Sequence, residues 1–170
     1  MVLFYLPRLE KFSSKVWTEM LKIAVCDDEQ NVTAEICALL EKYQTKTPDF
    51  PDFEISVFNA GADFLATEKQ FDLVFLDIEI NEMNGIEIAK ILNEQNPKII
   101  IIFVSSYTKY VTNTYRVHAF QFLVKPIDEN IFYEELARAM QTYLCAQEDY
   151  IINNKDEIIC LKTHDIVYLE

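Results

Sequence analysis

Glycine and basic residues are both scarce in this sequence. Only two glycines, Gly61 and Gly85, occur among its 170 residues, and 15 lysines and arginines stand against 28 aspartates and glutamates. The formal net charge is therefore -13, and no run of basic residues occurs. Because binding to nucleic acid phosphates depends on clustered lysine and arginine, this balance argues against nucleic acid binding by this chain alone. It leaves open whether the acidity serves ordinary solubility or docking to a partner.

Paired metal-binding and disulfide motifs are also missing. The four cysteines are far apart and form no C-x-x-C pair: Cys26, Cys37, Cys145 and Cys160. The two histidines, His118 and His164, lack metal-ligand spacing to another histidine or cysteine. The pattern argues against a zinc site and a disulfide framework, and it fits reduced thiols in a cytoplasmic protein.

A long hydrophobic run near the start of the chain is missing as well. The apolar run at residues 2–6 is ended by Pro7 and has no positive charge before it, so it predicts neither a signal peptide nor a membrane span. Two interpretations of this stretch are open. One is a short amphipathic helix, because apolar side chains recur at helical spacing in residues 9–20. The other is that Met20 is the native start. We favour Met20 and assign the N-terminal extension, residues 1–19, no function.

From residue 21 onward, short apolar runs alternate with segments of helical period. A chain of this length that is 51% hydrophobic can bury one compact core. The expected strands are residues 22–26, 54–58, 73–76, 99–104 and 119–124. The expected helices are residues 31–43, 60–67, 86–96, 108–115 and 130–146.

Two strand patterns set the expected architecture. Residues 99–104 are apolar throughout, which is typical of a central parallel strand, whereas residues 54–58 alternate and are expected at a sheet edge. With right-handed crossovers, the pattern predicts an α/β fold. This is a flavodoxin-like doubly wound five-stranded parallel sheet in the order 2-1-3-4-5, followed by a short β-type C-terminal fragment.

Polar residues stand at the ends of four of these strands. They are Asp27 and Asp28 after the first strand, Asp77 after the third, Ser105 after the fourth, and Lys125 and Pro126 after the fifth. Open α/β folds place ligands at this edge of the sheet. Three carboxylates in one pocket resist ionisation unless a cation lies among them, and an all-oxygen site suits Mg²⁺. A lysine and a hydroxyl opposite that metal suit a phosphoryl group.

This arrangement resembles the receiver domain of bacterial two-component response regulators, over about residues 21–147. In that family an acidic pair, an aspartate, a serine or threonine, and a lysine before a proline follow successive strands. The matching residues here are Asp27, Asp28, Asp77, Ser105 and Lys125. The resemblance implies that a sensor histidine kinase passes a phosphoryl group to Asp77 with Mg²⁺ as cofactor. It also implies a cytoplasmic signalling protein, not an enzyme, with autodephosphorylation at most.

The resemblance implies further roles around the acceptor. Asp28 would bind Mg²⁺ directly, Asp27 through water, and Glu79 through its backbone carbonyl, with Asp77 as a further ligand. Lys125 would pair with the phosphoryl oxygens, and Ser105 would donate its hydroxyl to them. Lys125–Pro126 matches a peptide that is cis in the family, an isomer that the sequence can only permit.

The loop after the acceptor carries a match and a departure. Gly85 stands eight residues after Asp77, where a family glycine closes the loop and supports backbone angles that other residues resist. Asn81 stands where relatives usually carry proline, which predicts a less rigid loop. Glu79 and Tyr107 would flank the path of a hydrolytic water and so tune the lifetime of the phosphoryl group.

The resemblance also predicts how a signal leaves the site. Phe122 stands where receivers carry a tyrosine or phenylalanine whose ring moves when the hydroxyl of Ser105 moves, and it is equally a core aromatic on a buried strand. The output surface would be the fourth helix, fifth strand and fifth helix. Receivers commonly form homodimers through that face.

After residue 147 the pattern changes to short β-type segments at residues 150–152, 157–162 and 165–170. They resemble the opening strands of the LytTR DNA-binding domain, with residues 164–170 as the best local match. We therefore expect three parts: residues 1–19, a receiver at 20–147, and a linker with a truncated LytTR-like start at 148–170. Intact relatives would regulate transcription by binding DNA, whereas DNA is not expected to bind this chain. A β-hairpin tail packed on the receiver is the alternative.

Two other functions remain open. A degenerate pseudo-receiver would act only as a protein-interaction module, although the five matched residues argue against it. A haloacid-dehalogenase-type phosphatase also uses an aspartate nucleophile with Mg²⁺, but it needs a second aspartate two residues later. Glu79 stands at that position, and Asn81 stands where a threonine would be expected.

Overall fold

The protein is described by a computed structural model that covers residues 20–47, 52–81, 83–106, 117–146, 149–154 and 157–162. Its main sheet has five parallel strands: β1 (Leu21–Cys26), β2 (Phe53–Phe58), β3 (Leu73–Leu76), β6 (Ile100–Ser105) and β7 (Gln121–Val124). Their spatial order is β2-β1-β3-β6-β7. Because β6 and β7 are the fourth and fifth strands of this sheet along the chain, the predicted order 2-1-3-4-5 is confirmed. The alternating strand β2 lies at an edge, as predicted.

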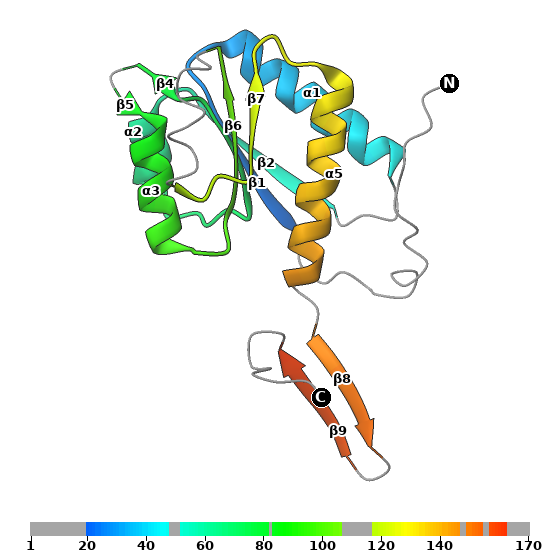
Figure 1. Ribbon diagram of the computed structural model, residues 1–170. Helices are drawn as coiled ribbons and strands as arrows, with labels where there is room; N and C mark the ends of the chain where they lie inside the picture. The colour runs from blue at the N-terminus through cyan, green and yellow to red at the C-terminus, as the bar shows by residue number, and fades with distance from the viewer. Residues whose placement is uncertain are drawn as a thin grey trace.

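Helices cover both faces of the sheet (Figure 1). The described helices are α1 (Gln30–Lys46), α2 (Gly61–Ala66), α3 (Gly85–Gln95) and α5 (Glu129–Ala146). Successive strand residues point to opposite faces, so β1 contributes to two cores. Ile23 and Val25 pack in a cluster with residues of α1 and α5, whereas Ala24 and Cys26 pack in one with residues of α2 and α3. Burial of β1 on both faces explains its continuous apolar run.

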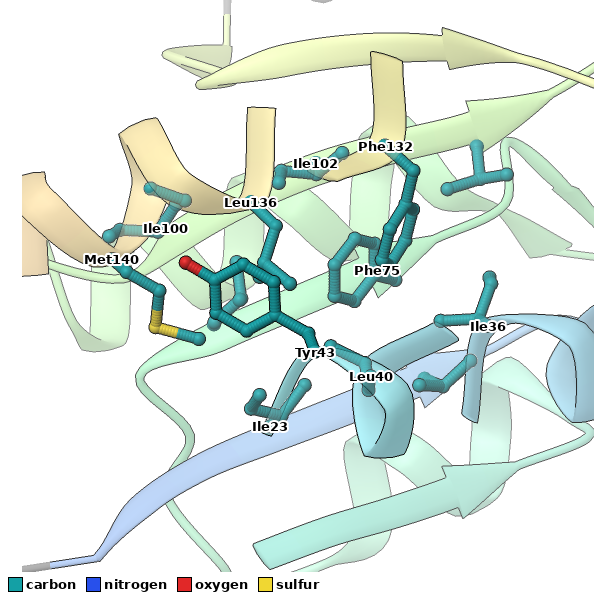
Figure 2. Packing of buried hydrophobic residues seen from close by; sticks show 14 of the residues in the cluster. Ile23, Ile36, Leu40, Tyr43, Phe75, Ile100, Ile102, Phe132, Leu136 and Met140 are labelled. Atoms are coloured by element: carbon teal, nitrogen blue, oxygen red, sulfur yellow. The ribbon is translucent and has the colours of Figure 1, made fainter. Parts of the chain in front are cut away.

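The core between the sheet, α1 and α5 is built around stacked aromatic rings (Figure 2). The rings of Phe75 on β3 and Phe132 on α5 are stacked with centroids 5.3 Å apart, and both residues are almost fully buried. Burial of one such side chain stabilises the fold by roughly 1.5–3 kcal/mol. Phe75 lies two residues before Asp77, so this packing fixes the strand that presents the acidic edge.

The loop after β3 contains a short ladder that the sequence did not predict. β4 (Glu79–Ile80) pairs antiparallel with β5 (Met83–Asn84). Asn81, in the turn between them, has φ 53°, a left-handed conformation that asparagine tolerates better than most residues. The fully buried Ile80 holds the ladder against the core formed with α2 and α3.

Two sequence predictions differ from the structure or fall outside it. Ser105 was expected just after the fourth strand, but it is the last residue of β6, because it pairs with Val124 of β7. The expected helix at residues 108–115, together with Tyr107, lies outside the described residues. The other predicted helices and strands are present with boundaries shifted by up to three residues.

A further two-stranded sheet follows the receiver-like part of the chain. β8 (Asp149–Asn154) and β9 (Glu157–Lys162) form an antiparallel hairpin separate from the main sheet. The β-type segments predicted at residues 150–152 and 157–162 are therefore β-strands, and the one predicted at 165–170 lies outside the described residues. Among the described helices, none has the length and apolar character that crossing a membrane requires.

Candidate functional site

The parallel register brings the polar strand ends to one edge of the sheet. Cys26 and Leu76 are paired at the ends of β1 and β3, and the backbone N–H of Asp77 donates to the Cys26 carbonyl at 2.9 Å. On the other side, the backbone N–H of Lys125 donates to the Ser105 carbonyl at 3.1 Å. These bonds continue the ladders past the strand ends, so the side chains that follow are held by rigid backbone.

Three carboxylates converge at this edge. One carboxylate oxygen from each of Asp27, Asp28 and Asp77 lies within 4.8 Å of the other two. Asp27 and Asp77 are buried and Asp28 is exposed. Hard cations such as Mg²⁺ prefer oxygen ligands and keep several waters. A cluster with one solvent-facing carboxylate is therefore chemically suited to such an ion, and these are residues that could hold it.

Each carboxylate is oriented by a backbone N–H group. Ile78 donates to Oδ1 of Asp77 at 2.6 Å, Glu29 donates to Oδ1 of Asp27 at 2.9 Å, and Asn81 donates to Oδ2 of Asp28 at 3.2 Å. Charge-assisted bonds of this kind are stronger than neutral ones. The acidic side chains are therefore held in place by the backbone around them.

Lys125 lies at the centre of the carboxylates, with its side chain only 8% exposed. Its Nζ is 2.7 Å from Oδ2 of Asp27, 2.9 Å from Oε1 of Glu29 and 3.1 Å from Oδ2 of Asp77. The contact with Asp27 is a close ion pair whose direction falls outside hydrogen-bond geometry, whereas Lys125 donates hydrogen bonds to the other two. Burial opposes the charge on Lys125, but these carboxylates outweigh it and raise the pKa of the ammonium. Lys125 is therefore a permanent cation beside Asp77.

The pKa values of Asp27 and of the Cys26 thiol are both raised at this edge. Desolvation raises the pKa of Asp27 above its ordinary value, although Lys125 and the Glu29 N–H act against it. Burial, reinforced by the charges of Asp27 and Asp77, raises the pKa of Cys26 to about 12. The Cys26 thiol therefore stays protonated at neutral pH and is not a nucleophile.

Gly85 is required by space. A Cβ at this position would stand 1.9 Å from the carbonyl oxygen of Asp77, far inside contact distance. The sequence argument relied on the freedom of glycine to adopt unusual backbone angles, and that reason was wrong, because Gly85 has no positive φ. The N–H of Gly85 donates to the Ile78 carbonyl at 2.7 Å, so the backbone of α3 closes directly onto the loop after Asp77.

The remaining predicted residues surround this edge. Ser105 is fully buried, and Phe122 is half-buried against the α2 and α3 core. Since Phe122 pairs with Phe103, two residues before Ser105, both side chains lie on the same face of the sheet. The Lys125–Pro126 peptide is cis, and Glu79 is exposed on β4.

One site residue was not identified from the sequence. Glu29, which directly follows the acidic pair Asp27 and Asp28, was not among the predicted site residues. The structure instead brings its side chain to Lys125, 96 residues later in the chain. The signal that could have found it is its place directly after the acidic pair, at the same strand end.

Known proteins are similar to this chain in both sequence and fold. The family model of the response regulator receiver domain matches residues 23–137. The sensory transduction protein LytT of Bacillus cereus is 32% identical over 139 residues, covering 82% of this chain and 53% of the relative. LytT of Bacillus subtilis is 27% identical over 160 residues, covering 88% and 64%. The chain therefore spans about half the length of the first relative and less than two thirds of the second.

Solved structures share the fold of this chain. The BeF3-activated receiver domain of DrrB, a Thermotoga maritima response regulator, is 25% identical, with a TM-score of 0.63 over 72% of this chain and 99% of that one. The LytT relatives are consistent with a LytTR-type regulator, as expected from the sequence. Because the family match extends over more than half of the sequence, this chain belongs to the response regulator receiver domain family.

Proposed function

We propose that this chain accepts a phosphoryl group on Asp77 from a sensor histidine kinase. The observation that carries the proposal is the placement of a buried cation, Lys125, 3.1 Å from the Asp77 carboxylate, within a cluster of oxygens suited to Mg²⁺. An oxygen of Asp77 forms a bond to phosphorus as the phosphorus–nitrogen bond of the phosphohistidine breaks. The electron pair of that bond returns to the imidazole, and Asp77 becomes an acyl phosphate.

The neighbouring residues would bind the metal and the phosphoryl oxygens. Asp28, Asp77 and the backbone carbonyl of Glu79 would hold Mg²⁺ directly and Asp27 through water. When bound, the metal neutralises charge on the transferring oxygens. Lys125 binds one of those oxygens as a point charge, and the hydroxyl of Ser105 donates to another.

The proposed output follows from the same edge. Movement of Ser105 toward the phosphoryl group would free space for the ring of Phe122, which lies on the same face of the sheet. The changed surface would be the face that includes β7 and α5, through which a homodimer would form. We place this receiver at residues 20–147, in the cytoplasm, with residues 1–19 outside it.

The larger protein of which such a chain would be part is proposed to regulate transcription. The matched regions cover 53% of the Bacillus cereus LytT protein and 64% of the Bacillus subtilis one, and residues 148–170 resemble the start of a LytTR domain. DNA binding would belong to that domain and not to the receiver. A signalling protein of this kind has no substrate to turn over beyond the slow loss of its own phosphoryl group.

The proposal is tested by intact-protein mass spectrometry after incubation with acetyl phosphate and Mg²⁺. We expect one added phosphoryl group, absent in Asp77→Asn and absent when EDTA removes the metal. Absence of an adduct, together with no binding of beryllofluoride, would establish a pseudo-receiver. Steady release of phosphate from a phosphate ester would instead favour a phosphatase of the haloacid-dehalogenase type.

A further inference from the structure

The ammonium of Lys125 has as many close carboxylate contacts as it has N–H donors. Asp27, Glu29 and Asp77 each place one oxygen within 3.1 Å of Nζ. A lysine ammonium carries three N–H groups and accepts no hydrogen bond. Two of these N–H groups donate to Glu29 and Asp77, and Oδ2 of Asp27 lies 2.7 Å from Nζ outside hydrogen-bond geometry. A phosphoryl oxygen that reaches the site must therefore compete with these three oxygens for the ammonium, and it binds Lys125 most closely when one carboxylate withdraws.

The three carboxylates differ in how easily they can withdraw. The side chains of Asp27 and Asp77 are 2% and 7% exposed, and each also accepts a backbone N–H on its other oxygen. The side chain of Glu29 is 52% exposed. Because a charge released into a dry pocket costs far more than one released into water, Glu29 is the carboxylate that leaves at least cost.

Backbone geometry also leaves the Glu29 side chain free to move. Glu29 stands at the N-cap of α1, but its side chain makes no capping hydrogen bond there. The local structure is stabilised by the backbone of Glu29 instead. Its N–H donates to Asp27, and its carbonyl accepts from the N–H groups of Val32 and Thr33. Removing the side-chain charge therefore leaves the start of α1 and the Asp27 orientation in place.

We propose that Glu29 is a displaceable counter-ion of Lys125. It occupies the ammonium while Asp77 is unmodified, and it competes with a phosphoryl group for the same donor. The charge of Glu29 therefore opposes filling of the site, and its loss makes the site bind phosphoryl-like anions more tightly. This inference rests on the proposed function, because it assigns Glu29 a positioning role in the same site.

The test is equilibrium binding of beryllofluoride at saturating Mg²⁺, followed by fluorine NMR. Glu29→Gln removes the charge and keeps the shape of the side chain. Glu29→Ala removes the side chain beyond Cβ, including the carboxylate. Glu35→Gln is the matched control, because Glu35 is an exposed glutamate on the same helix and its loss changes the net charge equally. Urea unfolding of each variant establishes that the fold is retained.

We expect both Glu29 variants to bind beryllofluoride about 1.5- to 5-fold more tightly than the wild type, the range that a partly exposed ion pair supports. The difference should narrow as salt rises from low to high concentration, because screening weakens the competing pair. Glu35→Gln should stay close to the wild type. A general effect of net charge would instead give Glu35→Gln the same gain, and it would overturn the proposal.

Failure of this inference and failure of the proposed function are distinguishable. If the wild type binds beryllofluoride and neither Glu29 variant binds it more tightly, Glu29 does not compete for Lys125, while the phosphoryl-accepting function stands. If the wild type binds no beryllofluoride even with Mg²⁺, the function is wrong, and the role of Glu29 falls with it.

Discussion

The carbonyl oxygen of Asp77 lies 1.9 Å from the point where residue 85 would carry a Cβ, so Gly85 touches the acceptor residue through the backbone alone. The Gly85 N–H also donates to the carbonyl of Ile78. A side chain at position 85 therefore cannot be accommodated by rotating a neighbour, and the acceptor loop or the first turn of α3 must shift.

Gly85→Ala is expected to destabilise the fold by about 1–3 kcal/mol, the cost of forcing a methyl group into packed structure. It should also reduce the yield of phosphorylated Asp77, because the displaced atom belongs to the acceptor residue. Urea unfolding and intact mass after acetyl phosphate treatment measure the two effects. Gly61→Ala is the matched control, since its Cβ would meet the flexible end of Ile88 at 2.7 Å. An equal loss of phosphorylation in both variants would contradict the local explanation.

Two substitutions of Asn81 test the role of the backbone N–H that reaches Asp28. Asn81→Gly keeps the N–H that reaches Asp28 and fits φ 53°, so Mg²⁺ affinity should stay near the wild-type value. Asn81→Pro removes the donor and requires φ near −65°, so it should weaken Mg²⁺ binding unless the loop rebuilds. Isothermal titration with Mg²⁺ measures both. Tighter binding in Asn81→Pro would mean that the N–H competes with the metal for Asp28 and does not orient it.

The Phe75–Phe132 stack gives a prediction for stability that does not involve the site chemistry. Phe132→Ala should lower the free energy of unfolding by about 3–5 kcal/mol, because Phe132 is fully buried and leaves a cavity beside β3. Ile131→Ala is the neighbouring control: Ile131 is 52% exposed, and its loss should cost less than about 0.5 kcal/mol. Chemical denaturation measures both. Similar costs at the two positions would contradict the packing described for α5.

The thiol of Cys26 should be unreactive in the folded protein. Its pKa is raised to about 12, chiefly by burial, so it is protonated and enclosed at pH 8. Iodoacetamide labelling followed by peptide mapping should modify Cys26 only after urea is added, and the half-buried Cys37 should be labelled faster. Rapid labelling of Cys26 without urea would show that the edge of β1 opens in the native state.

The raised pKa of Cys26 also predicts how the stability of the protein changes at alkaline pH. The pKa of the Cys26 thiol is higher in the folded protein than in the unfolded chain, where it is about 8.5. Its contribution to the free energy of unfolding is therefore fully present below about pH 8.5. This contribution is lost as pH rises through the interval up to the folded pKa. Cys26→Ala should therefore show a shallower loss of stability between pH 8.5 and 10 than the wild type, as measured by urea midpoints. An unchanged slope would assign the loss to other groups.

The sheet and most of the residues at its polar edge could be predicted, because they follow from local patterns in the sequence. Runs without polar alternation predict buried parallel strands, and charged residues at their ends predict which side chains meet, as with Asp27 and Asp77. The predicted end of β6 was one residue too early and left Ser105 outside the strand, because only the pairing of Ser105 with Val124 fixes where β6 ends. Apolar pattern alone cannot locate such a boundary.

Contacts between distant segments could not be predicted. The carboxylate of Glu29 meets an ammonium 96 residues away, and the N–H of Asn81 meets a carboxylate 53 residues away. Neither pairing produces a periodic pattern in the sequence, since each depends on the backbone direction of a single loop residue. The short ladder of β4 and β5 was missed for the same reason: two-residue strands are below the length that alternation can reveal.

The bond from the Gly85 N–H to the Ile78 carbonyl makes a single amide hydrogen an internal reporter. This hydrogen bond, 2.7 Å long, joins the residue after the acceptor to the first residue of α3. A rearrangement that moves Ile78 away from the start of α3 lengthens this bond. The exchange rate of that one proton with solvent, followed residue by residue, would therefore time the departure of the loop from its resting state, even in a protein whose overall spectrum had barely changed.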